Sequence, residues 1–114
     1  MDLTTNLADL AHARERTARY AQEIGEHELA GRLLKADLVN QARLAGKTKT
    51  DAETDAKLAE AYLMHEREGL NLAYCRDVTH AQAERLRFTI QAALANAELG
   101  LVRIAAGVPE GMTT

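Results

Sequence analysis

Residues 50–106 form one long stretch that favours helix almost without interruption. The stretch contains no proline and only two glycines, Gly69 and Gly100, and these are the residue types that most disfavour a helix interior. Thr50 and Glu53 at its start match the capping box, in which each side chain bonds to the backbone N–H of the other residue. At 1.5 Å per residue, an unbroken helix over this stretch is roughly 85 Å long. The sequence therefore predicts a helix over about residues 51–106.

The end of this stretch is marked by Gly107 and Pro109. Glycine permits the left-handed turn that commonly closes a helix, and proline cannot continue one. Residues 108–114 have little apolar content, so we expect them to form a flexible tail.

An earlier helix is predicted over about residues 6–45. Asn6 is a good N-cap residue, and a helical seam is indicated because mostly apolar positions recur every seven residues. These positions are Leu3, Leu10, Thr17, Ile24, Gly31 and Leu38. Glycine costs about 1 kcal/mol relative to alanine inside a helix. We therefore expect a bend or fraying in this first helix near Gly25 and Gly31.

Residues 46–50 form the predicted turn between the two helices. Gly46 is placed to close the first helix and Thr50 to cap the second. A connection this short makes the two helices antiparallel neighbours. The expected fold is therefore all-α, a long antiparallel helical hairpin with a possible break in its first helix.

The composition predicts that such a hairpin needs further copies. The chain has 114 residues and 46% hydrophobic content, which fits a single domain over residues 1–107. It has no tryptophan and one phenylalanine, and its many alanines form helices well but fill a core poorly. Because a thin hairpin buries little apolar surface, we expect it to assemble into an oligomeric helical bundle or ring.

The apolar residues of the second helix fall into two groups. Its first half carries Ala59, Leu63, Leu70, Tyr74, Val78 and Ala81 on one side. If the turn lies at residues 46–49, Asn6 faces about Thr89, and the chain beyond Thr89 extends past the first helix. The chain beyond Thr89 is also rich in apolar residues, and a large exposed apolar surface usually marks an interface. We therefore expect oligomer contacts at Ile90, Leu94, Ala97, Leu101 and Ile104.

The net charge and the single cysteine limit the partners and the compartment. A formal charge of −3 argues against binding nucleic acid through overall charge but leaves a local basic site open. Cys75 is the only cysteine, so no disulfide can form within the chain. The N-terminus lacks the apolar segment of a signal peptide, and no apolar run approaches the ~20 residues that cross a bilayer. We expect a cytoplasmic protein, in a host cell if it is phage-encoded, with no membrane contact.

The sequence offers no motif for catalysis or metal binding. Its four histidines are His12, His27, His65 and His80. No two of them have the His-x₃-His or His-Glu-x₂-His spacing of metal sites, and Asp77 with His80 supplies two ligands at most. Cys75 and His80 diverge by about 140° around a helix, which is unsuitable for a nucleophile and its base. We expect no enzyme activity, no cofactor and no metal.

Two groups of basic residues form the candidate nucleic-acid site. Arg43, Lys47 and Lys49 cluster at the turn, and Arg85 and Arg87 lie farther along the second helix. Repeated by oligomer symmetry, these side chains could form a ring of phosphate contacts. The alternative is a set of solvated positions with mixed ion pairs, each contributing only tenths of a kcal/mol.

The sequence resembles a family of small phage proteins, the UvsY-type recombination mediators. The resemblance covers roughly residues 40–102. It rests on Ala-Gly-Lys-Thr-Lys-Thr-Asp-Ala-Glu-Thr-Asp-Ala at 45–56, on Ala61, Tyr62, Glu66 and Tyr74 of the long helix, and on Glu-Arg-Leu-Arg-Phe-Thr-Ile-Gln at 84–91. It implies a ring-like helical oligomer that binds single-stranded DNA and helps a recombinase displace single-strand-binding protein. By position, the family's basic turn corresponds to Lys47 and Lys49, and its basic helix segment to Arg85 and Arg87.

Two readings from other functional classes stay open beside this one. The acidic surface also suits a helical protein-binding module, such as a phage inhibitor or adaptor of a host protein. A virion assembly protein is the third reading. The sequence does not distinguish these by itself, because helical periodicity specifies a surface and not its ligand.

Overall fold

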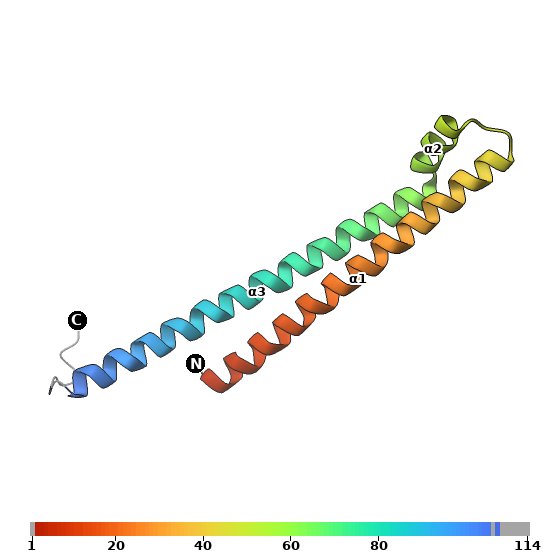
Figure 1. The fold of residues 1–114 in the computed structure, drawn as a ribbon. Helices are drawn as coiled ribbons and strands as arrows, with labels where there is room; N and C mark the ends of the chain where they lie inside the picture. Colours follow the sequence, from red (N-terminus) through yellow and green to blue (C-terminus); the bar gives the residue numbers. More distant parts are fainter. Residues whose placement is uncertain (1, 106, 108–114) are drawn as a thin grey trace. The chain divides into compact units, whose positions relative to one another are not determined.

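The computed structural model describes residues 2–105 and 107, and its elements are all α-helices (Figure 1). Helix α1 spans Leu3–Leu44, α2 spans Lys49–Leu58 and α3 spans Glu60–Ala105. No strand occurs among the described residues. The all-α prediction is therefore confirmed. None of the helices in the described part of the chain combines the length and the apolarity that a membrane span requires.

Helix α1 begins earlier than predicted and continues without the expected break. The Asp2 carboxylate accepts hydrogen bonds from the Thr4 N–H at 2.9 Å and from the Thr5 hydroxyl at 3.0 Å. Asp2 thus occupies the capping position that we assigned to Asn6. Gly25 and Gly31 both lie within the continuous helix, so the prediction of fraying there was wrong.

The turn confirms one predicted signal and corrects another. Gly46 has a φ of +94°, the left-handed conformation expected of a helix-closing glycine. The cap of the next helix, however, is Thr48, whose backbone is extended and whose hydroxyl accepts from the Asp51 N–H at 3.2 Å. Thr50 lies inside α2, and its carbonyl oxygen accepts from the Thr54 hydroxyl. The capping-box prediction at Thr50 was therefore wrong by two residues.

The continuous helix predicted over residues 51–106 is interrupted at Ala59. This residue has a φ of −62° and a ψ of +137°, which is extended backbone, and it separates α2 from α3. Ala52 and Ala56 of α2 are 0% and 2% exposed, so one face of α2 is covered. Because Ala59 is extended, α2 does not continue into α3 as one helix.

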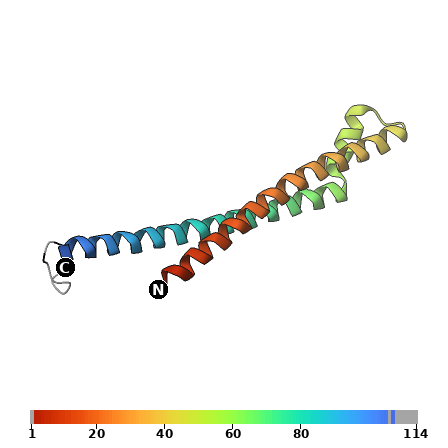
Figure 2. The same cartoon turned by 60° about the horizontal axis from the view of Figure 1, so that its bottom comes forward.

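The described chain divides into two compact units, and the prediction of a single domain over residues 1–107 stays a prediction. The terminal unit consists of Met1–Glu15 with Thr79–Thr114, and the turn unit consists of Arg16–Val78. Within each unit, segments of α1 and α3 lie side by side in both views (Figures 1 and 2). Gly107 has a φ of +79°, as expected for the residue that ends the last helix, and the predicted tail at 108–114 lies outside the described residues.

The terminal unit has a small apolar core. Its buried members are Leu10 and Ala13 of α1 with Ala83 and Ile90 of α3, and Leu86 packs against them. Leucine and isoleucine here meet alanines, which lets the two helices approach closely while burying few large side chains. The apolar cluster therefore joins the helices but leaves much of their apolar surface uncovered.

The turn unit presents the apolar stripe of α3 to solvent. Leu63, Leu70 and Tyr74 are 48%, 74% and 67% exposed. These residues belong to the group that the sequence placed on one side of the second helix. The side of α3 that contacts α1 in this unit instead carries His65 and Gly69. The stripe is thus available for contacts outside the chain.

Candidate functional site

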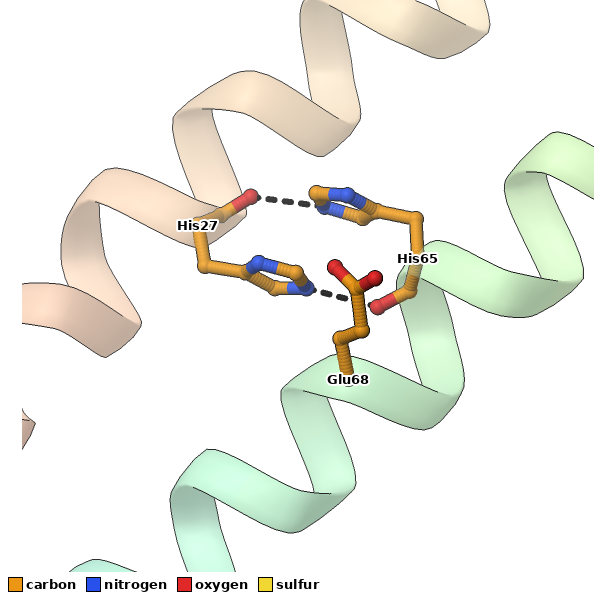
Figure 3. Close-up of side chains that lie close together, drawn as sticks. All are labelled: His27, His65 and Glu68. Carbon is orange, nitrogen blue, oxygen red and sulfur yellow. Dashed lines mark hydrogen bonds between the residues drawn. The ribbon is translucent and has the colours of Figure 1, made fainter.

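Two histidines from different helices form a stacked pair at the centre of the turn unit. His27 of α1 and His65 of α3 have ring centroids 3.6 Å apart and planes inclined by 3°. Nε2 of His27 lies 2.6 Å from the His65 carbonyl oxygen, and Nε2 of His65 lies 2.8 Å from the His27 carbonyl oxygen. Figure 3 shows this reciprocal arrangement, with Glu68 beside the rings.

The hydrogen bonds fix which ring nitrogen carries a proton. A backbone carbonyl can only accept, so Nε2 of each ring must donate. In a neutral ring of this tautomer, Nδ1 has no proton and can accept a bond. Each imidazole therefore ties its own helix to the backbone of the other helix, and the pair is satisfied by partners within the chain.

A glycine opposite each ring makes room for the pair. A Cβ atom added to Gly31 would lie 2.6 Å from His65 Nε2, and one added to Gly69 would lie 3.2 Å from His27 Cδ2. Real Cβ contacts are essentially never shorter than 3.0 Å. Gly31 is therefore required by packing, which explains its place inside a helix despite the propensity cost. We call His27, His65, Gly31 and Gly69 the histidine clasp.

A short repeat in the sequence underlies the histidine clasp. The pattern His-Glu-x₂-Gly-x₂-Leu occurs at residues 27–34 and again at 65–72, and the paired histidines are 38 positions apart. Because the two helices run antiparallel, equal segments meet about a local two-fold axis. Metal-ligand spacings within one helix do not reveal this signal, because it lies between the two helices.

His27, His65 and Glu68 also form the cluster best placed to hold a metal among the described residues. One ligand atom from each lies within 4.8 Å of the others. A metal ion, however, lies close to the plane of each imidazole that binds it through a nitrogen lone pair. Two parallel rings 3.6 Å apart have no common plane in which one ion can sit. In this arrangement the pair acts as a structural contact and not as a chelate.

Two hollows flank the histidine clasp, and the local two-fold axis relates their linings. One, of about 370 Å³, is lined by His27, Glu28, Gly31, Arg32, Lys35, Tyr62, His65 and Glu66. The other, of about 530 Å³, is lined by Ile24, His27, Glu28, Glu66, Gly69, Leu70, Ala73 and Arg76. Arg32 and Lys35 in the first correspond to Leu70 and Ala73 in the second. The backbone symmetry is therefore not matched by the charges.

The predicted basic residues of the turn are not a free cationic cluster. Lys47 bonds to Asp55 of α2, and this hydrogen bond together with the carboxylate charge raises the pKa of Lys47. Arg43 and Lys49 are exposed beside it. Lys47 has this partner because the turn at Gly46 brings Asp55 of α2 back to the basic residues.

The second predicted basic group lies in the terminal unit. Arg87 donates to Glu84 from Nη2 at 2.7 Å and from Nε at 3.2 Å. This hydrogen bond, more than the charge of Arg87, lowers the pKa of Glu84. The Arg87 guanidinium also lies 4.5 Å from the centroid of the Phe88 ring, and Phe88 is 60% exposed. Arg85 is exposed next to this group.

The residues predicted to form the oligomer interface differ in their exposure. Ile90 is 6% exposed and packs with Leu10 and Ala13 of its own chain, so the prediction that it lies beyond the first helix was wrong. The reason is that α1 begins at Leu3 and therefore reaches farther along α3. Leu94, Ala97 and Leu101 are exposed, and the side chain of Ile104 lies outside the described residues.

Cys75 belongs neither to the histidine clasp nor to the two basic groups. Cys75 is half-buried and free. Comparison with known proteins adds no family: no protein-family model, no curated protein and no solved structure matches this chain.

Proposed function

We propose that this protein is a non-enzymatic, homo-oligomeric accessory protein whose copies join through the C-terminal part of α3. One observation carries the proposal. Ile90 is 6% exposed, whereas Leu94 and Leu101 farther along the same stripe are 47% and 68% exposed. Positions 90, 94, 97 and 101 follow the alternating four- and three-residue spacing of a helical seam. The seam thus continues as an apolar surface beyond the part that α1 covers.

The hydrophobic effect gives the reason for a second copy at this seam. Burying a leucine side chain stabilises a complex by about 1.5–3 kcal/mol, and each copy contributes Leu94 and Leu101. Ala97 between them lets helices approach closely. We define the C-terminal seam as Leu94, Ala97 and Leu101, and like seams from two or more copies complement one another.

Charge placed on the C-terminal seam tests the proposal. Leu94→Glu combined with Leu101→Glu is expected to lower the mass measured by sedimentation equilibrium while the helical circular dichroism is retained. Leu99→Glu is the matched control, because Leu99 is 46% exposed but lies about 140° away from Leu94 around the helix. Unchanged assembly in the double variant, or equal loss in the control, would contradict the proposed interface.

Binding of single-stranded DNA is a second candidate function, and the exposed ring of Phe88 favours it. An aromatic side chain beside arginines is a common platform for unpaired bases, since every base can stack and the cations contact phosphates. Phe88 has Arg87 over its ring and Arg85 close in sequence. A role in loading a recombinase, with displacement of single-strand-binding protein, rests on the resemblance to the UvsY-type mediators.

Fluorescence anisotropy with a labelled single-stranded oligonucleotide tests this function. We expect binding that weakens steeply with salt and that is lost in Phe88→Ala, or in Arg85→Ala with Arg87→Ala. Lys47→Ala with Lys49→Ala should weaken binding while leaving the oligomer intact, and Lys57→Ala on α2 is the control. No binding at low ionic strength would exclude the DNA function and favour a protein-binding module or a virion assembly protein.

A further inference from the structure

We propose that the outward stripe of α3 in the turn unit pairs antiparallel with the same stripe of a second copy. This stripe consists of Leu63, Arg67, Leu70, Tyr74 and Asp77, and we call it the outer seam. It is a separate surface from the C-terminal seam, so each chain would have two contact faces. The inference does not depend on the function proposed above.

The spacing of the outer seam is that of a coiled-coil contact. Its members alternate steps of four and three residues, which keeps them on one side of a helix. Leu70 and Tyr74 lie about 140° and 180° around α3 from His65, and His65 bonds to α1. The outer seam therefore faces away from α1, and its apolar members are well exposed, Leu70 at 74% and Tyr74 at 67%.

The charges at the ends of the outer seam select the partner and its direction. Arg67 precedes Leu70 by three residues, and Asp77 follows Tyr74 by three. In an antiparallel pair centred on Leu72, Leu70 meets Tyr74 of the second copy. Arg67 then meets Asp77 of the second copy, and the symmetric contact repeats this pair at the other end. The seam is thus self-complementary in both shape and charge, as a two-fold symmetric interface requires.

A parallel pair of the same seams would be unfavourable. It would place Arg67 against Arg67 and Asp77 against Asp77, and like charges that face each other across an interface oppose association. A polar residue in a seam position can specify the register of paired helices, and opposite charges between helices set their orientation. Within one chain, Asp77 contacts the adjacent Arg76 at 3.2 Å, an exposed ion pair of the kind that contributes little. It can therefore exchange this contact for Arg67 of the second copy.

A charge swap in the full-length chain tests the outer seam, measured as the dimer dissociation constant by sedimentation velocity. The background is Leu94→Glu with Leu101→Glu, which removes the C-terminal seam. We expect this background to form a dimer. Arg67→Asp or Asp77→Arg alone should weaken the dimer by about tenfold or more, because each creates like-charge contacts at both ends. The double variant Arg67→Asp with Asp77→Arg should restore the constant to within about threefold.

Two outcomes of the charge swap would overturn the proposal. If the Leu94→Glu, Leu101→Glu background is monomeric, the outer seam does not bind a second copy. This result contradicts the outer seam even if the C-terminal seam behaves as proposed. A double variant as weak as either single variant excludes the Arg67–Asp77 contact. Arg16→Asp, which makes the same charge change at an exposed position of α1, should leave the dimer unchanged, and equal weakening there would mean a general charge effect.

A distance measurement tests the direction of pairing independently. A spin label on Gln82→Cys, in a Cys75→Ser chain with the same background, lies ten residues from the centre of the antiparallel pair. The two labels should then be roughly 30 Å apart along the axis. A parallel pair would hold them about 10 Å apart. The shorter distance, or no defined distance, would contradict the proposed pairing.

Discussion

The terminal unit and the turn unit hold α1 against α3 by different means. In the terminal unit, Leu10, Ala13, Ala83 and Ile90 form an apolar cluster. In the turn unit, the histidine clasp joins the two helices by stacked rings and by hydrogen bonds to the opposite backbone. The same pair of helices thus uses apolar packing in one place and directional polar contacts in the other.

The difference shows how a pair of long helices obtains both stability and register. Apolar contacts are non-directional and tolerate side chains of similar volume, so the apolar cluster alone permits the helices to slide. The histidine clasp permits one register, because each Nε2 must reach a particular carbonyl and each ring needs a glycine opposite. We interpret the apolar cluster as the main source of stability and the clasp as the element that fixes alignment.

Removal of side-chain volume from the apolar cluster should have the largest effect on stability. Ile90→Ala is expected to lower the free energy of unfolding by about 2–3 kcal/mol, since it deletes buried methyl groups and leaves a cavity. Urea unfolding followed by circular dichroism, at fixed protein concentration, measures the change. Leu99→Ala serves as control because Leu99 is exposed, and an Ile90→Ala effect no larger than the control's would mean that α1 does not cover Ile90.

Glycine substitutions should separate the clasp from ordinary helix propensity. Gly31→Ala is expected to destabilise by about 1–2 kcal/mol, because overpacking against His65 outweighs the gain in propensity. Gly25→Ala is the matched control on the same helix, where nothing lies within 4 Å of the added Cβ, and it should stabilise by about 1 kcal/mol. Gly69→Ala should fall between the two. Stabilisation by Gly31→Ala would show that the clasp does not form.

The start of α2 offers a smaller test within the turn unit. Thr48→Ala should cost about 1 kcal/mol, since the hydroxyl that accepts from Asp51 is removed. Thr50→Ala, two residues later, should change stability by less than about 0.5 kcal/mol. Thermal unfolding of the two variants measures the difference. A larger loss of stability in Thr50→Ala than in Thr48→Ala would mean that Thr50 is the cap.

The smallest expected effect concerns the exposed ion pair of the terminal unit. Arg87 lowers the pKa of Glu84, so the carboxylate favours the folded state above its unfolded-state pKa, and this contribution is lost as the pH falls through the folded-state pKa. Glu84→Gln should therefore make unfolding slightly less sensitive to acid as the pH falls below the ordinary glutamate pKa, measured in urea titrations. A steeper acid dependence in the variant would contradict the assigned direction.

Much of the fold could be predicted because it depends on local signals. The long runs without proline, the left-handed Gly46 and the left-handed Gly107 all act within a few residues of themselves. The caps were less predictable, because Asp2 and Thr48 compete with Asn6 and Thr50, which are equally good capping residues. The break at Ala59 carries no local signal, since alanine favours helix.

The contacts of the candidate site could be predicted only in part, for a related reason. The contact of Lys47 with Asp55 could not be predicted, because the two residues are 8 positions apart and only the turn brings them together. His27 and His65 gave no metal-ligand spacing, although their shared His-Glu-x₂-Gly-x₂-Leu pattern predicts a symmetric contact once the helices are known to be antiparallel. Leu94, Ala97 and Leu101 are exposed, and their role as an oligomer interface stays a prediction.

The mass of the unaltered protein in solution, measured by sedimentation equilibrium over a wide concentration range, tests the account most directly. One chain has a mass of 12.5 kDa. The exposed seams of α3 predict a mass that is a defined multiple of this value and that falls on dilution. A single-chain mass at every concentration, with the helices intact, would contradict the account, because the apolar surfaces of α3 would then need no second copy.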